Sequence, residues 1–207
     1  IAASFSGQLN VVKWLLGRGA NIEASNANGD TALITASFNG HVPVVKWLLE
    51  KDANIEAKSD QGYTALICAS QNGHIKTVKE LLQRSADIEA SDAAGITSLI
   101  AASMNGHVNT VNELLQRGAD IEASTAAGVT SLMFASKYGH EKVVKELLDN
   151  GADIEASNND GGTSLIAASF LGCVKTVELL LEKGADPTVV NIHGFTAGGL
   201  AVARGHN

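Results

Sequence analysis

Aromatic side chains and cysteine are scarce in this sequence of 207 residues. Phe, Trp and Tyr make up only 4% of it, which excludes a core built around large rings and leaves the interior to Leu, Ile, Val and Ala. Side chains of this size favour thin layers of closely spaced helices. The two cysteines, Cys68 and Cys173, are too few for the disulfide framework of a small secreted domain. We therefore expect reduced thiols and a cytoplasmic or nuclear location.

Long apolar runs, basic charge and the common catalytic motifs are also missing. No run reaches the roughly 18 residues of a membrane-spanning helix and no signal peptide opens the chain, so we expect no membrane insertion. The net charge of −7 repels phosphate backbones and argues against a nucleic-acid partner. Phosphate-binding glycine loops, Gly-x-Ser-x-Gly elbows and Cys-x-x-Cys pairs do not occur. We therefore expect no catalytic residues, no cofactor and no enzyme activity.

The sequence does contain a regular 33-residue period. Three features recur with this step: a threonine, a glycine nine residues later, and a pair of leucines. The threonines are Thr31, Thr64, Thr97, Thr130, Thr163 and Thr196. The glycines are Gly7, Gly40, Gly73, Gly106, Gly139, Gly172 and Gly205. A fixed period of this length indicates an array of stacked repeats.

A single period can be interpreted physically from the stretch around residues 92–124. Thr97 is suited to cap a first helix, and Gly106 can adopt the left-handed conformation that ends it. A second helix is predicted from near His107 to Gly118, with an apolar stripe on one side. The following residues alternate small or apolar with polar side chains, which indicates an extended, hairpin-like loop. Two such short helices can bury their apolar faces only by stacking on neighbouring units.

This unit of two helices and a loop resembles the ankyrin repeat, which has a 33-residue period. The threonine, the glycines, the leucine pair and a Gly-Ala-Asp triplet all match in phase. The resemblance implies an all-α solenoid with protruding β-hairpin-like loops, in one domain that covers residues 1–207. Full repeats are expected at 26–58, 59–91, 92–124, 125–157 and 158–190, with partial repeats at 1–25 and 191–207. We expect the chain to be a piece of a longer protein, with uncapped ends that could self-associate head to tail.

Two departures from the ankyrin pattern concern the stack itself. Ile34 and its equivalents replace the histidine of the family's Thr-Pro-Leu-His signature, so stacking is expected to depend more on apolar packing. Gly118, which follows the second helix, is replaced by Asp52 and Ser85 in earlier repeats. We expect these two residues to be left-handed at a cost of about 1 kcal/mol each.

Histidines and carboxylates also recur at fixed positions. His41, His74, His107, His140 and His206 share one position. Packed helices lie about 8–10 Å apart, whereas zinc–nitrogen bonds are near 2 Å. We therefore expect no metal site, and expect each histidine to bond to local backbone at a helix start. The equivalent glutamates, Glu23, Glu56, Glu89, Glu122 and Glu155, are interpreted as a solvated acidic edge.

Some positions vary between repeats, which indicates that stacking does not determine their residues. These positions are the candidates for recognition of a partner. They lie just before the first-helix glycine and just after the hairpin glycine, and the resemblance implies that they form a concave face that holds partners. The expected contact residues are Phe38, Asn39, Tyr63, Gln71, Ile96, Met104, Val129, Lys137, Tyr138, Phe170 and Leu171. Many are apolar or aromatic, as at interaction surfaces. The alternative is that some of them only cover the first helices.

A second candidate patch consists of Trp14 and Trp47. They occupy the position that Glu80, Glu113 and Glu146 hold in later repeats. A position that accepts glutamate three times is expected to be exposed to solvent, so two tryptophans there would form an apolar spot on the outer side.

The hypothesis that follows is a non-catalytic scaffold that binds a protein or peptide along its concave face. The alternative is a targeting or spacer arm in a larger multidomain protein whose activity lies outside this segment.

Overall fold

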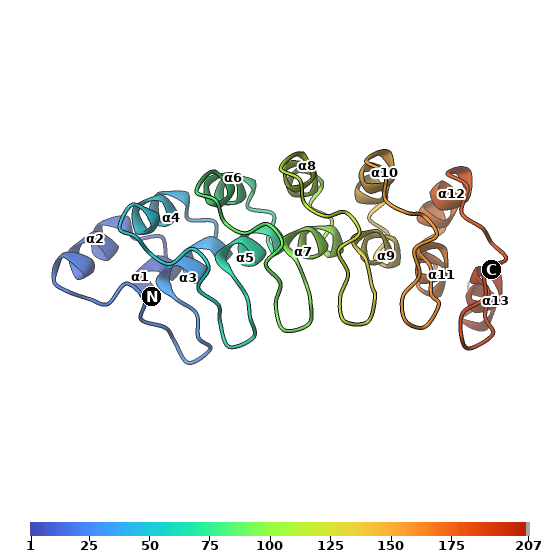
Figure 1. Cartoon of the computed structure of the whole chain (residues 1–207), viewed down its shortest axis with the longest axis horizontal. Helices are drawn as coiled ribbons and strands as arrows, with labels where there is room; N and C mark the ends of the chain where they lie inside the picture. Colours follow the sequence, from blue (N-terminus) through green and yellow to red (C-terminus); the bar gives the residue numbers. More distant parts are fainter. Residues whose placement is uncertain (206–207) are drawn as a thin grey trace.

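The computed structural model describes residues 1–205 and has two rows of short helices with loops projecting from them (Figure 1). The first helices of the repeats are α1 (Ala2–Phe5), α3 (Ala32–Phe38), α5 (Ala65–Gln71), α7 (Ser98–Met104), α9 (Ser131–Lys137), α11 (Ser164–Phe170) and α13 (Ala197–Ala203). The second helices are α2 (Leu9–Gly17), α4 (Val42–Leu49), α6 (Ile75–Gln83), α8 (Val108–Gln116), α10 (Glu141–Asp149) and α12 (Val174–Glu182). The expected all-α solenoid is confirmed.

Local sequence explains where the helices begin and end. The Thr97 hydroxyl accepts a hydrogen bond from the Ile100 amide at 3.4 Å, and every threonine of the series caps its helix in the same way. The loops between repeats are narrow hairpins. Isolated antiparallel bridges close three of them, joining Ser25 to Thr31, Ser91 to Thr97 and Ser124 to Thr130. Within residues 1–205 these bridges do not extend into strands.

The core is a continuous apolar layer that runs the length of the array. Leu66, Leu99, Leu114 and Leu147 are at most 1% exposed, and buried alanines let neighbouring first helices approach closely. Apolar side chains at the signature-histidine position are buried as well in the five full repeats, as expected: Ile34, Ile67, Ile100, Met133 and Ile166. First helices contact their neighbours more extensively than second helices do. The array therefore curves with the first helices on its inner side (Figure 1).

The histidine series joins one repeat to the next. The Nε2 atom of His107 lies 2.9 Å from the carbonyl oxygen of Gln71, and the Nε2 atom of His140 lies 3.0 Å from that of Met104. His41 and His74 make the same contact. The expectation of a bond to local backbone was wrong, because the partner lies 36 residues earlier, at the end of the first helix of the preceding repeat. His206 lies outside the described residues.

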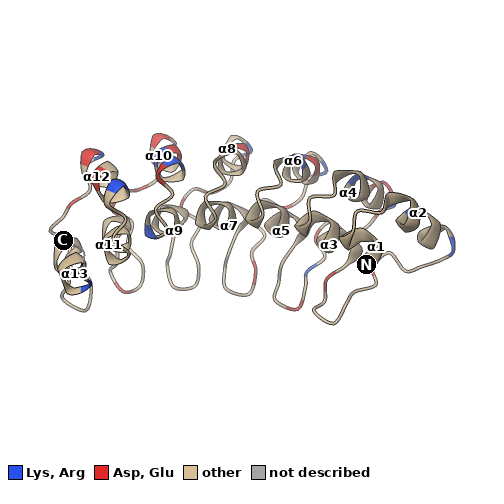
Figure 2. Cartoon of the chain, turned by 180° about the vertical axis from the view of Figure 1, so that it is seen from behind, with Lys and Arg blue, Asp and Glu red and all other residues tan. Residues whose placement is uncertain are grey.

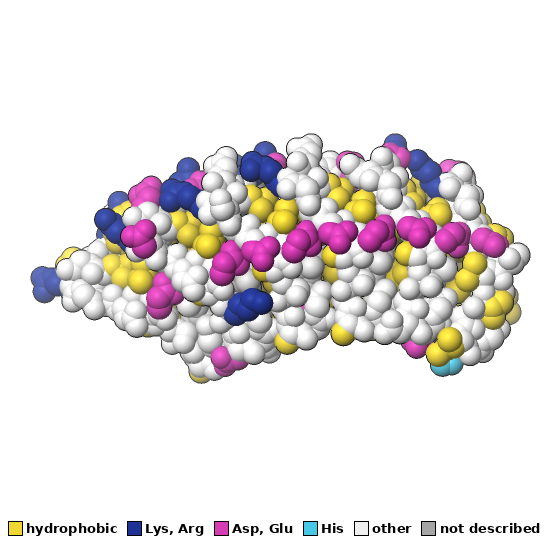
Figure 3. Space-filling model, viewed as in Figure 1, with side chains coloured by type: hydrophobic (Ala, Val, Ile, Leu, Met, Phe, Trp, Pro, Cys, Tyr) yellow, Lys and Arg dark blue, Asp and Glu magenta, His cyan; other side chains and the backbone are white. Residues whose placement is uncertain are grey.

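The glutamate series also ties repeats together. One carboxylate oxygen of Glu89 accepts a hydrogen bond from the Asp120 amide in the next repeat at 2.8 Å. Glu23, Glu56, Glu122 and Glu155 do the same at 2.7–2.8 Å. In Figure 3, acidic side chains form a line across the middle and C-terminal part of one side of the molecule. The predicted acidic edge is exposed at Glu23, Glu89, Glu122 and Glu155, with Glu56 half-buried. The prediction missed that the carboxylates also satisfy amides that open the next loop.

Backbone bonds between loop tips add a third connection. The Ala93 amide donates to the Gln61 carbonyl at 3.0 Å, and the equivalent bond recurs between each of the successive hairpins from 26–31 to 191–196. From residues 26–58 to residues 125–157, each repeat is thus joined to the next at the end of its first helix, at the start of its long loop and at its hairpin tip. The loops are held in register by these bonds although they project from the helices.

The expected left-handed residues are confirmed, since Asp52 has φ +60° and Ser85 has φ +61°. We predict that Ser85→Gly stabilises the array by about 1 kcal/mol, because glycine adopts this conformation without the steric cost of a Cβ atom. Thermal unfolding followed by circular dichroism should show a midpoint about 2–4 °C higher. Gly118→Ser, at the equivalent position, should lower the midpoint by a similar amount. An unchanged midpoint in both variants would contradict this account.

A second prediction concerns the glycine that ends each first helix. Gly106 and Gly139 both have φ +70° to +73°, but a Cβ atom at Gly106 would lie 2.7 Å from His140 Nδ1, whereas one at Gly139 would lie 3.2 Å from Cys173 Sγ. Both Gly→Ala variants should be destabilised by at least about 1 kcal/mol from backbone strain. Gly106→Ala should lose more, because the imidazole must move and give up its inter-repeat bond. Urea denaturation measures the difference, and equal losses would argue against the histidine contact.

Candidate binding face

The concave face is formed by the ends of the first helices and by the hairpin loops. None of the eleven residues predicted for it is buried. Phe38, Tyr138 and Leu171 are each 45% exposed. The other eight are half-buried. The side chains therefore cover part of the first helices and still present apolar surface to solvent.

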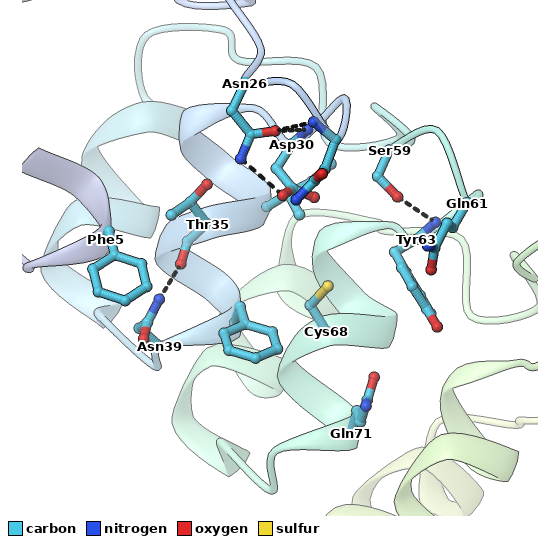
Figure 4. A pocket seen from close by; sticks show the side chains of 13 residues that line it. Phe5, Asn26, Asp30, Thr35, Asn39, Ser59, Gln61, Tyr63, Cys68 and Gln71 are labelled. Atoms are coloured by element: carbon cyan, nitrogen blue, oxygen red, sulfur yellow. Dashed lines mark hydrogen bonds between the residues drawn. The ribbon is translucent and has the colours of Figure 1, made fainter. Parts of the chain in front are cut away.

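Four of the predicted residues meet in a cavity of about 480 Å³ near the N-terminal end, which we call the N-terminal cleft. They are Phe38, Asn39, Tyr63 and Gln71. Figure 4 labels the last three of them. The rest of its wall comes from Phe5, Asn26, Asn28, Asp30, Ile34, Thr35, Ser59, Gln61 and Cys68. The cleft thus draws on three successive first helices and the two hairpins beside them.

Hydrogen bonds fix the polar wall of the N-terminal cleft. Asn26 Oδ1 accepts bonds from the amides of Asn28 and Asp30 at 2.8 and 2.9 Å, and Asn26 Nδ2 donates to Asp30 Oδ2 at 3.0 Å (Figure 4). The Ser59 hydroxyl accepts a bond from the Tyr63 amide at 3.1 Å. These bonds fix the hairpin backbone and therefore the positions of Asp30 and Tyr63, which directly follow the turns. Asn39 is engaged as well, since its Nδ2 donates to the Thr35 carbonyl at 2.9 Å.

A second cavity of about 530 Å³, the C-terminal cleft, lies at the other end of the same face. Lys137 and Phe170 are the two predicted residues in its wall. Its other residues include Asn158, Asp160, Gly162, Ile166, His193, Phe195 and Arg204. The guanidinium of Arg204 lies 4.0 Å from the centre of the Phe170 ring.

The remaining predicted residues lie along the concave face but line neither cleft: Ile96, Met104, Val129, Tyr138 and Leu171. Tyr138 is flanked by the ammonium of Lys137, 5.5 Å from its ring centre, and by His140. The predicted contact residues did not include Asn26, Asp30 or Cys68, although Asp30 holds the variable position just after a hairpin glycine. The asparagine and aspartate are visible in the sequence as hairpin residues, but the cleft itself requires three repeats in contact.

Charged residues are distributed unevenly between the two rows of helices. Figure 2 shows Lys, Arg, Asp and Glu mainly on the second helices and in the loops, whereas the first helices are almost free of charge. Lys137 is the one charged residue within helices α3 to α11 of that row. A charged side chain on the concave face therefore has few charged neighbours on the first helices that could neutralise or repel it.

The second candidate patch differs from its prediction. Glu80 and Glu113 are only 7% and 8% exposed, so the expectation that this position faces solvent was wrong. The position lies against the preceding second helix, where Lys46 and Lys79 form ion pairs with the two glutamates at 3.4 and 3.2 Å. Trp47 is half-buried there and packs against the core.

Trp14 at the equivalent position is 59% exposed, with the guanidinium of Arg18 4.9 Å from its ring centre. Trp47 lines a shallow cavity with Lys13, Leu16 and Ile22, and Trp14 is not part of that wall. The two tryptophans therefore do not form one patch.

Within residues 1–205, no three His, Cys, Asp or Glu side chains cluster in a way that could hold a metal ion. None of the helices described is both long enough and apolar enough to span a bilayer.

The two thiols differ in exposure. Cys68 is 5% exposed, and burial, helped by the negative charge of Asp30, raises its pKa to about 12. Burial raises the pKa of Cys173 as well, and its thiol donates to the Lys137 carbonyl at 3.4 Å, in the place of the histidine bond. The buried Cys68 thus behaves as a small apolar side chain in the cleft floor.

We predict that iodoacetamide at pH 8 labels Cys173 well before Cys68 in the native protein. With a pKa near 12, only about one Cys68 in ten thousand is a thiolate at that pH. Mass spectrometry of the digested protein measures the label at each site. In urea the two rates should converge, and a Cys173→Ser variant should stay almost unlabelled until it unfolds. Native labelling of Cys68 at its unfolded rate would contradict the burial.

Comparison with known proteins places the chain in a family. A sequence model described as "Ankyrin repeats (3 copies)" matches residues 1–92 and 99–191. The crystal structure of the human ASB11 ankyrin repeat domain is similar to this one with a TM-score of 0.89 and 28% sequence identity, over 97% of this chain and 90% of that chain. No curated protein sequence matches the chain significantly. Since the family match spans most of its length, the chain belongs to the ankyrin repeat family.

Proposed function

We propose that this ankyrin array is a non-catalytic scaffold that binds a protein or peptide on its concave face. Ankyrin repeat domains are generally protein-interaction modules and typically non-catalytic. The observation that carries the proposal is the row of exposed or half-buried apolar side chains on this face, interrupted by two clefts. Apolar surface of this kind usually marks an interaction site.

One position on this face supports the proposal directly. In the second to fourth repeats it holds Asn39, Asn72 and Asn105, whose amides donate to the carbonyl four residues earlier at 2.8–2.9 Å. In the next two repeats it holds Tyr138 and Leu171, both 45% exposed. These side chains give up the helix-end bond and gain little burial. A partner that covers them would supply the missing apolar contact.

The scaffold is also suited to binding because it is ordered in advance. Inter-repeat bonds from histidines, glutamates and loop tips hold successive concave-face positions in register. A partner therefore pays little entropy to order this surface on association. Tyr63, Met104 and Tyr138 are our central anchors, since binding hot spots tend to lie near the middle of an interface and to be aromatic.

The test begins with peptides selected on the parent protein from a displayed library of random 16-residue sequences, which are long enough to span the concave face. Their affinities are then measured by fluorescence polarisation for a variant with Tyr63→Ala, Met104→Ala and Tyr138→Ala. We expect a loss of at least tenfold, because each truncated hot spot costs about 1 kcal/mol or more.

The matched control is Lys76→Ala, Asn109→Ala and Lys142→Ala, three exposed residues at one position of the second helices. It should bind like the parent, and circular dichroism should show that both variants fold. Selected peptides that bind the concave-face variant as tightly as the parent would refute this face as the site. Peptides that lose affinity only for the control variant would place binding on the outer helices.

A further inference from the structure

The two clefts occupy equivalent places in the repeat and differ by four periods. Phe38 corresponds to Phe170, and Tyr63 to Phe195, each pair separated by 132 residues. In both clefts a phenylalanine at the end of a first helix shares the cavity with an aromatic ring that follows the next hairpin glycine. The three intervening repeats lack such a pair, with Gln71 and Ile96, Met104 and Val129, and Lys137 and Gly162 at the same two positions.

The charges in these two equivalent clefts are opposite. Asp30 is the one charged residue in the wall of the N-terminal cleft. The C-terminal cleft has Gly162 where the first has Asp30, and Lys137 where the first has Phe5. Arg204 adds a second positive charge to the C-terminal cleft, against the single carboxylate of Asp160. The same aromatic frame is therefore acidic at one end of the concave face and basic at the other.

Asp30 is placed to receive a cation from outside the chain. It is half-buried, and its Oδ2 accepts the bond from Asn26. In the part of the chain that the structure describes, Asp30 forms no ion pair with a lysine, arginine or histidine. Asp30 and the buried Cys68 both line this cleft, so the carboxylate faces the cavity from its wall. A partly desolvated carboxylate without a cation favours binding of a basic group.

The aromatic walls favour a guanidinium over an ammonium. A planar guanidinium can stack on the faces of Phe38 and Tyr63 while its N–H groups reach a carboxylate. The chain shows the same stacking at its other end, where the Arg204 guanidinium lies over Phe170. In the C-terminal cleft that position is thus already taken by a cation of the chain, which leaves the cleft suited to an acidic group.

We propose, building on the proposed function, that a partner peptide places an arginine side chain in the N-terminal cleft and an acidic side chain in the C-terminal cleft. The opposite charges then fix the direction in which the peptide lies on the concave face. Four repeats at about 8–10 Å each separate the clefts by roughly 32–40 Å. An extended peptide covers that span with about 10–12 residues between its two charged side chains.

The experiment uses two small probes, N-acetyl-arginine-N-methylamide and N-acetyl-glutamate-N-methylamide, titrated into the ¹⁵N-labelled protein and followed by NMR. Arginine should shift amide resonances around Asp30 and Tyr63, and glutamate those around Gly162 and Phe195. Each probe is the control for the other, since both clefts are in the same molecule. The citrulline analogue, which has the shape of arginine without its charge, should bind the N-terminal cleft at least tenfold more weakly.

Variants that change charge with little change of shape complete the test. Asp30→Asn should weaken arginine binding about tenfold or more and leave glutamate binding unchanged. Lys137→Gln combined with Arg204→Gln should do the reverse. Glu178→Gln, an exposed residue of α12 that lines neither cleft, should affect neither probe. Retained binding of the opposite probe shows that each variant is folded.

Several results would overturn this inference. Equal binding of arginine and citrulline would do so, as would arginine shifts of equal size in both clefts or shifts confined to the acidic line of loop glutamates. Failure here is distinguishable from failure of the proposed function. Selected peptides that lose affinity for the triple-alanine variant but not for Asp30→Asn would retain the concave face as the site and reject the charge assignment.

Discussion

Contact between neighbouring repeats is the constraint on which this structure depends. Two helices of seven to nine residues cannot bury their apolar faces alone, so each pair is stable only between two others. Stacking also supplies hydrogen-bond partners for backbone groups that would have none within a single repeat. The carbonyl at the end of a first helix meets a histidine, and the amide opening a loop meets a glutamate, both from an adjacent repeat. The apolar layer and the polar bonds therefore form together or not at all.

Some positions in each repeat take part in stacking and others do not, which explains why some are uniform along the chain and others vary. Positions such as Thr97 and Leu99 serve the cap or the buried layer, and their equivalents change little along the chain. Among residues 1–205, Asp30 bonds only within its own hairpin, and no hydrogen bond joins the side chain of Lys137 to a neighbouring repeat. Such positions can change without breaking the stack. The charge and polarity of the concave face are thus set by side chains that do not contribute to stacking.

The features of the fold that could be predicted from the sequence are those determined by residues close together in the chain. The period, the threonine caps and the left-handed Ser85 depend on residues within one repeat, and the structure has them as expected. The partners of His107 and Glu89 lie 36 and 31 residues away, so only the stacked geometry shows which backbone group each one meets. Glu80 was misjudged for the same reason, because the lysine that pairs with it belongs to the preceding repeat.

The clefts show how a repetitive scaffold can become directional. An array of identical repeats offers the same surface at every step, and a bound peptide could then slip by one repeat. Here the aromatic pair occurs only in the two clefts. The N-terminal cleft has Asp30 and Phe5 where the C-terminal cleft has Gly162 and Lys137, so the two clefts carry opposite charge. Reversing a peptide with complementary charges would place like charges together and lose both attractions, which penalises the wrong orientation. Register would then come from the two aromatic pairs and direction from the charges of Asp30, Lys137 and Arg204, while the rest of the face supplies apolar contact.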